Sequence, residues 1–174
     1  EVLKGVARGV YLVAFNKVYR RRIFQGLRYP VGKLYEDTFI VADVYARAKR
    51  VACLNRALYD YRQRSTGIML GTRKLRDYDA VEAAEALIDR LLEMRLTDAV
   101  PASEKMMFTS LRNVYYHLPP EQRRDPRTKD AKRRHWATLR KMRTHHCLPV
   151  KTAVRSAAFH LAPALCRRWW ADCR

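Results

Sequence analysis

Two adjacent carboxylates, Glu36 and Asp37, are the residues of this sequence best suited to acid–base chemistry. They follow the stretch "LRYPVGK", which a proline and a glycine mark as a loop, and a helix is predicted over 37–50. An aspartate at a helix start caps backbone N–H groups and meets the positive end of the helix dipole. A carboxylate placed in a cleft can instead act as a general base. The pair by itself leaves both interpretations open.

The surrounding motifs favour the chemical interpretation. Three blocks, "AFNKVYRRRIF", "GLRYPVGKLYEDT" and "AKRVACLNRALYDYRQRSTGIM", occur in this order within about residues 8–70. Together they resemble the acceptor-side half of bacterial family 2 glycosyltransferases. Members of that family commonly show W-N-K-L-Y-R-R, then G-I-R-F-P-E-G-x-x-Y-E-D, then A-K-K-V and L-Y-Y-Y-R-Q-R-x-x-S-I-M.

The resemblance implies an inverting transfer of a sugar from a nucleotide-diphosphate donor to a hydroxyl acceptor. By position, Asp37 is then the general base that takes the proton from the acceptor hydroxyl, and Glu36 helps to place the acceptor. An inverting displacement needs a carboxylate on the acceptor side of the anomeric carbon. The family-level expectation is a glycan or lipid-linked acceptor in cell-envelope or polysaccharide synthesis.

Two further sets of residues receive expected roles from the same resemblance. The leaving diphosphate needs positive charge, so Arg62, Gln63 and Arg64 are candidates for binding it or for shaping the acceptor loop. An exposed basic strand end is the alternative for these three. Asn16 and Lys17 match the N-K of the family motif and are expected to pack or to position a loop.

The sequence departs from the family pattern in several places. Phe15 stands where the family usually has Trp, Val31 replaces a frequent Glu and Gly67 a common Ser. The family's nucleotide-binding half, with a metal-binding D-x-D, is not in this sequence. We therefore expect a truncated or partial sequence that is inactive by itself. The complete enzyme would use Mg²⁺ or Mn²⁺, for which this chain supplies no ligands.

Two other strings of possible ligands are better explained without a metal. Asp77-Tyr78-Asp79 is a D-x-D string, but it begins a predicted amphipathic helix, where capping and solvation account for the acids. His145-His146-Cys147 lacks a second ligand cluster at zinc-site spacing.

The expected fold class is α/β: the C-terminal part of a GT-A, Rossmann-like domain followed by an α-helical region. The runs 51–55 and 56–64 indicate strands, and apolar spacing predicts an amphipathic helix over 75–95. A second helix is predicted over 103–117. The expected organisation is a GT-A part at 1–72, a helical extension at 73–120, a basic linker at 121–147 and a basic amphipathic tail at 148–174.

The second predicted helix has an expected start and stop. Ser103 is a candidate N-cap, and Pro119-Pro120 should end the helix.

Charge and composition bound the partners. The 174 residues carry a net charge of +19 and are 48% hydrophobic, which favours a packed core and anionic partners. A nucleic-acid-binding or membrane-surface module without catalysis is the alternative function. Nucleic acid is not the expected partner, because no RNP-like, zinc-finger or helix-turn-helix pattern appears. The four cysteines show no C-x-x-C spacing, which favours free thiols.

The tail has an apolar stripe with basic flanks. Such a helix, closed by Trp169-Trp170, fits an anionic membrane surface through 148–170, or it packs as a last core helix; both interpretations stay open. The expected location is cytoplasmic, peripheral at the inner face of the cell membrane. The stripe consists of Val150, Val154, Ala157, Ala158, Leu161 and Leu165, flanked by Lys151, Arg155, Arg167 and Arg168.

Overall fold

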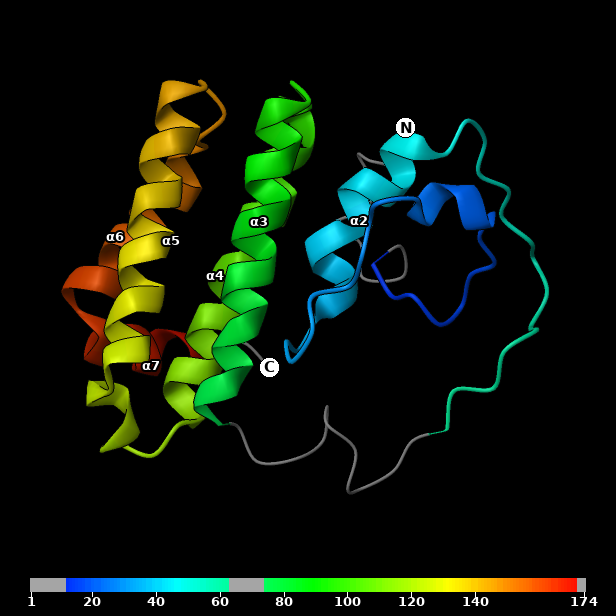
Figure 1. Ribbon diagram of the computed structural model, residues 1–174. Coiled ribbons are helices and arrows are strands. Elements are labelled where there is room, and N and C mark those ends of the chain that lie inside the picture. Colours follow the sequence, from blue (N-terminus) through cyan, green and yellow to red (C-terminus); the bar gives the residue numbers. More distant parts are fainter. Residues whose placement is uncertain (1–11, 63–73, 172–174) are drawn as a thin grey trace.

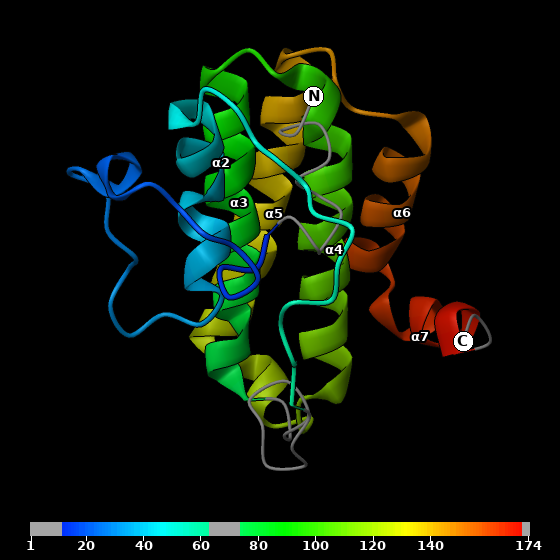
Figure 2. The same cartoon turned by 90° about the vertical axis from the view of Figure 1, so that its right-hand side faces the viewer.

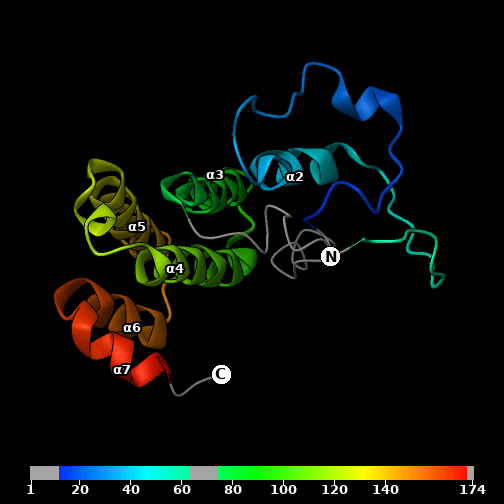
Figure 3. The same cartoon turned by 90° about the horizontal axis from the view of Figure 1, so that it is seen from below.

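The computed structural model describes residues 12–62 and 74–171, and within these ranges every regular element is a helix (Figure 1). The helices between residues 79 and 161 lie roughly side by side, and the last helix lies across them (Figures 1 and 2). The segment at 12–35 wraps around the outer side of the helix that follows it (Figure 3). In chain order the elements are η2 (Arg21–Phe24), α2 (Glu36–Arg47), η3 (Leu75–Tyr78), α3 (Asp79–Glu93), η4 (Thr97–Ala99), α4 (Val100–His117), η5 (Gln122–Arg124), α5 (Pro126–Thr144), α6 (Val150–Leu161) and α7 (Pro163–Ala171).

The expected α/β, GT-A fold is wrong for the part of the chain that the structure describes. The predicted strands at 51–55 and 56–62 run as an extended, exposed segment without regular structure. A strand is stable only when its backbone N–H and C=O groups pair with a neighbour. Neither described range offers such a partner, so the β-type residue pattern stays unpaired. Gln63 and Arg64, the end of the second predicted strand, lie outside the described residues.

Helix α3 is the centre of the structure. It packs against α2 on one side and against α4 and α5 on the other (Figures 1 and 3). The predicted helix over 75–95 is confirmed, except that its first turn is the 3-10 helix η3. Apolar residues at helical spacing explain its central position, because they cover more than one face. Those buried along α3 are Val81, Ala83, Ala84, Leu87, Ile88, Leu91 and Leu92.

Helix α4 begins earlier than the sequence predicted. Its first turn holds Pro101, a position at which a missing N–H costs no hydrogen bond. Ser103 therefore lies inside the helix, and its hydroxyl donates to the carbonyl oxygen of Ala99 at 3.2 Å. The prediction of Ser103 as N-cap is wrong, whereas the end of the helix just before Pro119-Pro120 is confirmed.

Helix α5 lies in the segment expected to be a basic linker, 121–147, and was not predicted as a helix. Asp125 caps it by accepting a hydrogen bond from the Arg127 backbone N–H at 2.8 Å. The many charged residues of this segment make its buried side difficult to recognise in the sequence, although each turn has a residue buried against the core. Such residues include Ala131, His135, Leu139 and Met142.

The tail forms two helices rather than one. α6 ends at Leu161, and Pro163 starts α7, because a proline cannot continue the preceding helix. Both lie on the side of the bundle opposite α2 (Figure 3). Phe159 joins the core through an edge-to-face contact with Phe108, with ring centroids 5.6 Å apart.

Candidate functional site

Asp37 lies in the first turn of α2, where two backbone N–H groups hold its carboxylate. Oδ1 accepts from the Thr38 N–H at 2.7 Å, and Oδ2 accepts from the Ala14 N–H at 3.3 Å. Tyr35, in a left-handed conformation with φ 60°, is the N-cap residue and turns the chain into the helix. The carboxylate thus meets a helix N-terminus, as the capping interpretation requires, but it also reaches a segment 23 residues away.

Burial controls the proton affinity of Asp37. It raises the pKa of the carboxyl above its ordinary value, and the charge of Glu36 raises it further. The hydrogen bonds from Thr38 and Ala14 oppose this shift without cancelling it. Glu36 itself is exposed. Asp37 is therefore a stronger base than a solvated aspartate, beside a carboxylate that faces water.

The N-K motif lies beside Asp37. The ammonium of Lys17 donates to Asn16 Oδ1 at 2.6 Å and to the carbonyl oxygen of Val13. Burial lowers the pKa of Lys17, and the nearby charge of Asp37 acts in the opposite direction. The expectation that Asn16 and Lys17 position a loop remains a prediction, and the structure places both in the segment that touches the carboxylate.

Two tyrosines near Asp37 were not singled out from the sequence. Burial is the main reason that the pKa of the Tyr19 phenol and that of Tyr29 are raised, and the negative charge of Asp37 adds to both shifts. Both rings contact Phe24, with centroid distances of 5.3 and 5.7 Å. A repeated aromatic signal at the 3-10 helix could have indicated them, since they bracket it in sequence.

The third sequence block contacts the first through aromatic stacking. The ring of Phe15 stacks on Tyr59 and Tyr61, with centroids 5.2 and 5.0 Å apart. Arg62 follows Tyr61 and is exposed. Gln63 and Arg64 lie outside the described residues, so the roles expected for them stay predictions. Phe15 directly follows Ala14, so the first block contacts both Asp37 of the second block and the rings of the third.

Asp79 ties this region to the bundle. The carboxylate is 3% exposed, accepts the Leu34 backbone N–H at 3.0 Å and pairs with Lys33 and Arg127. Lys33 and Leu34 immediately precede Tyr35, the N-cap residue of α2, so Asp79 fixes the loop that leads into the site.

Asp77 and Asp79, the two acids of the D-x-D string, make different contacts. The capping expected of this string is confirmed at Asp77, which accepts the Lys74 N–H at 2.7 Å. The expectation that solvation accounts for Asp79 is wrong, because that side chain is buried.

A second cluster of ionisable groups lies inside the bundle. Glu104 and His135 are both fully buried, with Oε1 and Nε2 3.1 Å apart. His135 Nδ1 lies 3.0 Å from His160 Nε2, and Arg155 donates to the other oxygen of Glu104 at 2.6 Å. Burial lowers the pKa of His160 to about 4, with His135 and Lys132 adding to the shift. Sequence spacing did not indicate this cluster, because its members come from three helices.

No metal site accompanies these residues in the parts of the chain that the structure describes, 12–62 and 74–171: no three His, Cys, Asp or Glu side chains gather closely enough to hold an ion. The Mg²⁺ or Mn²⁺ expected for the complete enzyme stays a prediction, and no step below depends on one. Over the same ranges, none of the helices is both long and apolar enough to cross a bilayer.

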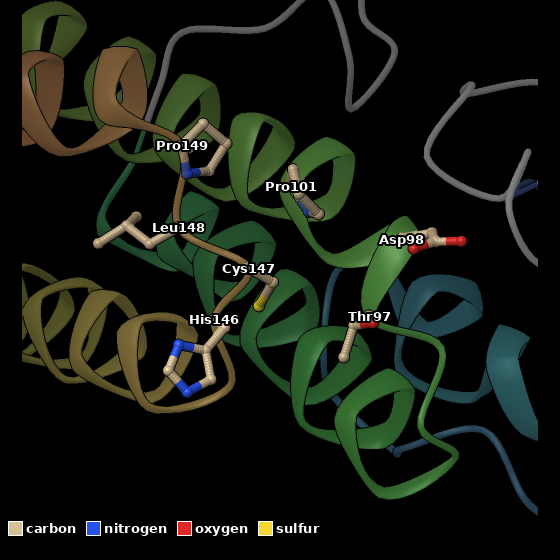
Figure 4. A pocket seen from close by; sticks show the side chains of 7 residues that line it. All are labelled: Thr97, Asp98, Pro101, His146, Cys147, Leu148 and Pro149. Atoms are coloured by element: carbon tan, nitrogen blue, oxygen red, sulfur yellow. The ribbon is translucent and has the colours of Figure 1, made fainter.

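A hollow of about 350 Å³ lies far from Asp37. It is formed between the turn before α4 and the segment joining α5 to α6, at the end of the bundle opposite the start of α3 (Figures 1 and 2). Figure 4 shows its lining side chains, which include His146 and Cys147. None of the residues that line it belongs to the three motifs.

Comparison with known proteins gives one partial relationship. The chain is 43% identical over 51 residues to glycosyltransferase GlyA of Streptococcus pneumoniae serotype 4. The alignment covers 29% of this chain and 7% of GlyA, so the chain spans a small part of that relative. No family model and no solved structure matches the chain. The match supports a relationship to glycosyltransferases at a coarse level.

Proposed function

We propose that this chain carries the acceptor side of an inverting glycosyltransferase of the family 2 type, with Asp37 as the general base. The observation that carries the proposal is the state of that carboxylate. It is half-buried, its pKa is raised, and it accepts a hydrogen bond from the first motif, which in turn stacks on the third. The match to a glycosyltransferase is consistent with this chemistry.

The proposed step balances as a single displacement. Asp37 removes the proton from an acceptor hydroxyl while the hydroxyl oxygen forms a bond to the anomeric carbon of a nucleotide-diphosphate sugar. The bond between that carbon and the diphosphate oxygen breaks, and the diphosphate leaves with the electron pair. A carboxylate with a raised pKa suits this role, because it accepts a proton more readily than a solvated aspartate.

Neighbouring residues take supporting roles in the proposal. Glu36, exposed beside the base, places the acceptor. Arg62, Gln63 and Arg64 bind the leaving diphosphate, whose charge the two arginines neutralise. Asn16 and Lys17 hold the segment whose N–H donates to Asp37.

The test replaces Asp37 by Asn in the full-length gene product and measures nucleoside diphosphate released from a panel of UDP-, GDP- and dTDP-sugars. General-base catalysis contributes about 10²- to 10⁴-fold, so release should fall by at least about 100-fold. Glu93→Gln, at an exposed ion pair with Arg90 outside the proposed site, is the matched control and should retain full activity. Undiminished turnover of Asp37→Asn would contradict the assignment.

A second proposal concerns location. Most of the apolar stripe of the tail faces outward: Val150, Val154, Leu161 and Leu165 are exposed, whereas Ala157 and Ala158 are partly buried and Ala158 packs against the core. Thr152, Ser156 and Phe159 form the inner face. Exposed Lys151 and Arg167 lie beside the stripe. We propose that this face lies on an anionic membrane surface, at the cytoplasmic side of the cell membrane.

Co-sedimentation with vesicles tests this placement. The double variant Val154→Asp/Leu161→Asp should bind vesicles containing phosphatidylglycerol at least about tenfold more weakly than the wild type. Leu54→Asp, which changes an exposed apolar residue outside the tail, should bind normally. Equal sedimentation of the double variant would remove the membrane from the proposal. Loss of self-association in the same variant would assign the face to a second copy instead.

A further inference from the structure

Three exposed aromatic rings stack on one another, and one of them, Phe15, directly follows the residue whose N–H donates to Asp37. Phe15 is 44% exposed, Tyr59 52% and Tyr61 51%, although the rings stack on one another. Phe15 and Tyr61 are almost parallel, with an interplanar angle of 4°. Large aromatic side chains normally bury their faces when they pack, so a stack that leaves this much ring surface in water suits a ligand.

The position of the stack relates it to Asp37. The Ala14 N–H donates to the Asp37 carboxylate, and Phe15 is the next residue along the chain. Segments 46 residues apart in sequence, at Phe15 and Tyr61, therefore form one surface beside the group that would receive the acceptor proton. Asn16 and Arg62 directly follow the two rings and add polar groups at the edge of this surface.

The chemistry of the surface fits a sugar ring. An aromatic face carries partial negative charge and attracts the slightly positive C–H groups that line one face of a pyranose. Hydroxyl groups at the ring edge then reach polar neighbours, in the manner of binding sites that combine apolar walls with few polar groups. An acceptor sugar on this surface would present a hydroxyl near Asp37.

We propose that Phe15, Tyr59 and Tyr61, the aromatic platform, bind the ring of the acceptor sugar and orient its hydroxyl toward Asp37. This inference rests on the proposed glycosyl transfer and names its acceptor class, a glycan with an accessible pyranose face. The platform holds the ring, and Asp37 carries out the proton transfer.

Binding of methyl glycosides to the full-length gene product tests the platform. Saturation-transfer NMR with the methyl glycosides of glucose, galactose, N-acetylglucosamine and rhamnose should show transfer to C–H protons on one ring face. Tyr61→Ala and Phe15→Ala should weaken the binding about tenfold. Tyr61→Phe keeps the ring and should bind normally. Trp136→Ala, which removes an exposed ring from the bundle, is the matched control.

The outcomes separate the platform from the proposed function. Asp37→Asn should still bind the glycosides, because the base is not part of the platform. If Asp37-dependent transfer occurs but Phe15→Ala and Tyr61→Ala bind and react like the wild type, the platform is wrong and the base stands. If none of the glycosides binds, the platform is overturned whatever Asp37 does. Platform-dependent binding of poly(U) without sugar binding would assign the rings to nucleic acid.

Discussion

The segment 12–62 and the helices of 74–171 are held together by different interactions. In the first, loops reach across one another through single hydrogen bonds and exposed ring contacts, as at Asp37 and the aromatic platform. In the second, helices bury a continuous apolar core and an ion cluster around Glu104. The candidate chemistry lies in the first region, and most of the packing lies in the second.

Helix α2 connects the two regions, and its contacts show what the difference means. Val41, Ala42 and Tyr45 join the core of the bundle, so the helix that carries Asp37 is fixed by apolar packing. Arg90 pairs with Asp43 at 2.7 Å on the same interface. The loops around Asp37 have no such core, and they depend on tethers such as Asp79. A site built in this way can adjust to a substrate while its base stays in place.

The largest expected effect tests the bundle. Glu104→Ala removes the partner of both His135 and Arg155 and leaves their polar groups buried, which should lower the free energy of unfolding by about 3–5 kcal/mol. Urea unfolding followed by circular dichroism at 222 nm measures it. Glu93→Ala, at an exposed ion pair with Arg90, should change stability by less than about 1 kcal/mol. Equal losses in both variants would contradict the importance of the buried cluster.

A smaller effect tests the tether between the regions. Asp79→Ala removes the acceptor of the Leu34 N–H and the partner of Lys33 and Arg127, and should cost about 1.5–3 kcal/mol. Hydrogen exchange at the Leu34 amide should accelerate more than exchange in α4. Uniform acceleration along the chain would show that Asp79 supports the bundle rather than the loop.

The smallest effect depends on pH. The pKa of His160 falls to about 4 in the folded state, from an ordinary value of 6.5, so the unfolded chain binds more protons between these values. Stability is therefore complete above about pH 6.5 and decreases as the pH falls toward 4, by about 2 kcal/mol between pH 7.5 and 5. Urea unfolding at both pH values measures the change.

Two variants decide whether His160 is responsible. His160→Gln should lose most of this pH dependence, whereas His145→Gln, at an exposed histidine, should keep it. An unchanged pH dependence in His160→Gln would place the titration elsewhere.

Elements with a clear apolar period could be predicted from the sequence. The helix over 37–50 appears as α2 and the helix over 75–95 as η3 and α3, because local spacing specifies an apolar face. Helix α5 was missed since its charged residues mask one buried residue per turn. The strands expected at 51–55 and 56–62 failed for a different reason. A β-type pattern indicates residues that favour a strand, but the strand forms only when a partner strand pairs with it.

The residues of the candidate site likewise differ in whether the sequence could identify them. Asp37, Glu36 and Arg62 could be named from their motifs, because the residues of each motif are adjacent in the chain. The relation of Tyr19, Tyr29 and Asp79 to the site was not predicted, since it depends on contacts that folding makes between distant segments.

By itself, the sequence determined a basic chain, two amphipathic helices and the identity of an acidic pair with a coarse relationship to glycosyltransferases. The tertiary structure decided which residues surround that pair and which face of the tail looks outward. The physical reason is the range of the interactions. Helix formation depends on neighbours three or four residues away, whereas desolvation, ring stacking and ion pairing depend on what folding brings together from distant parts of the chain.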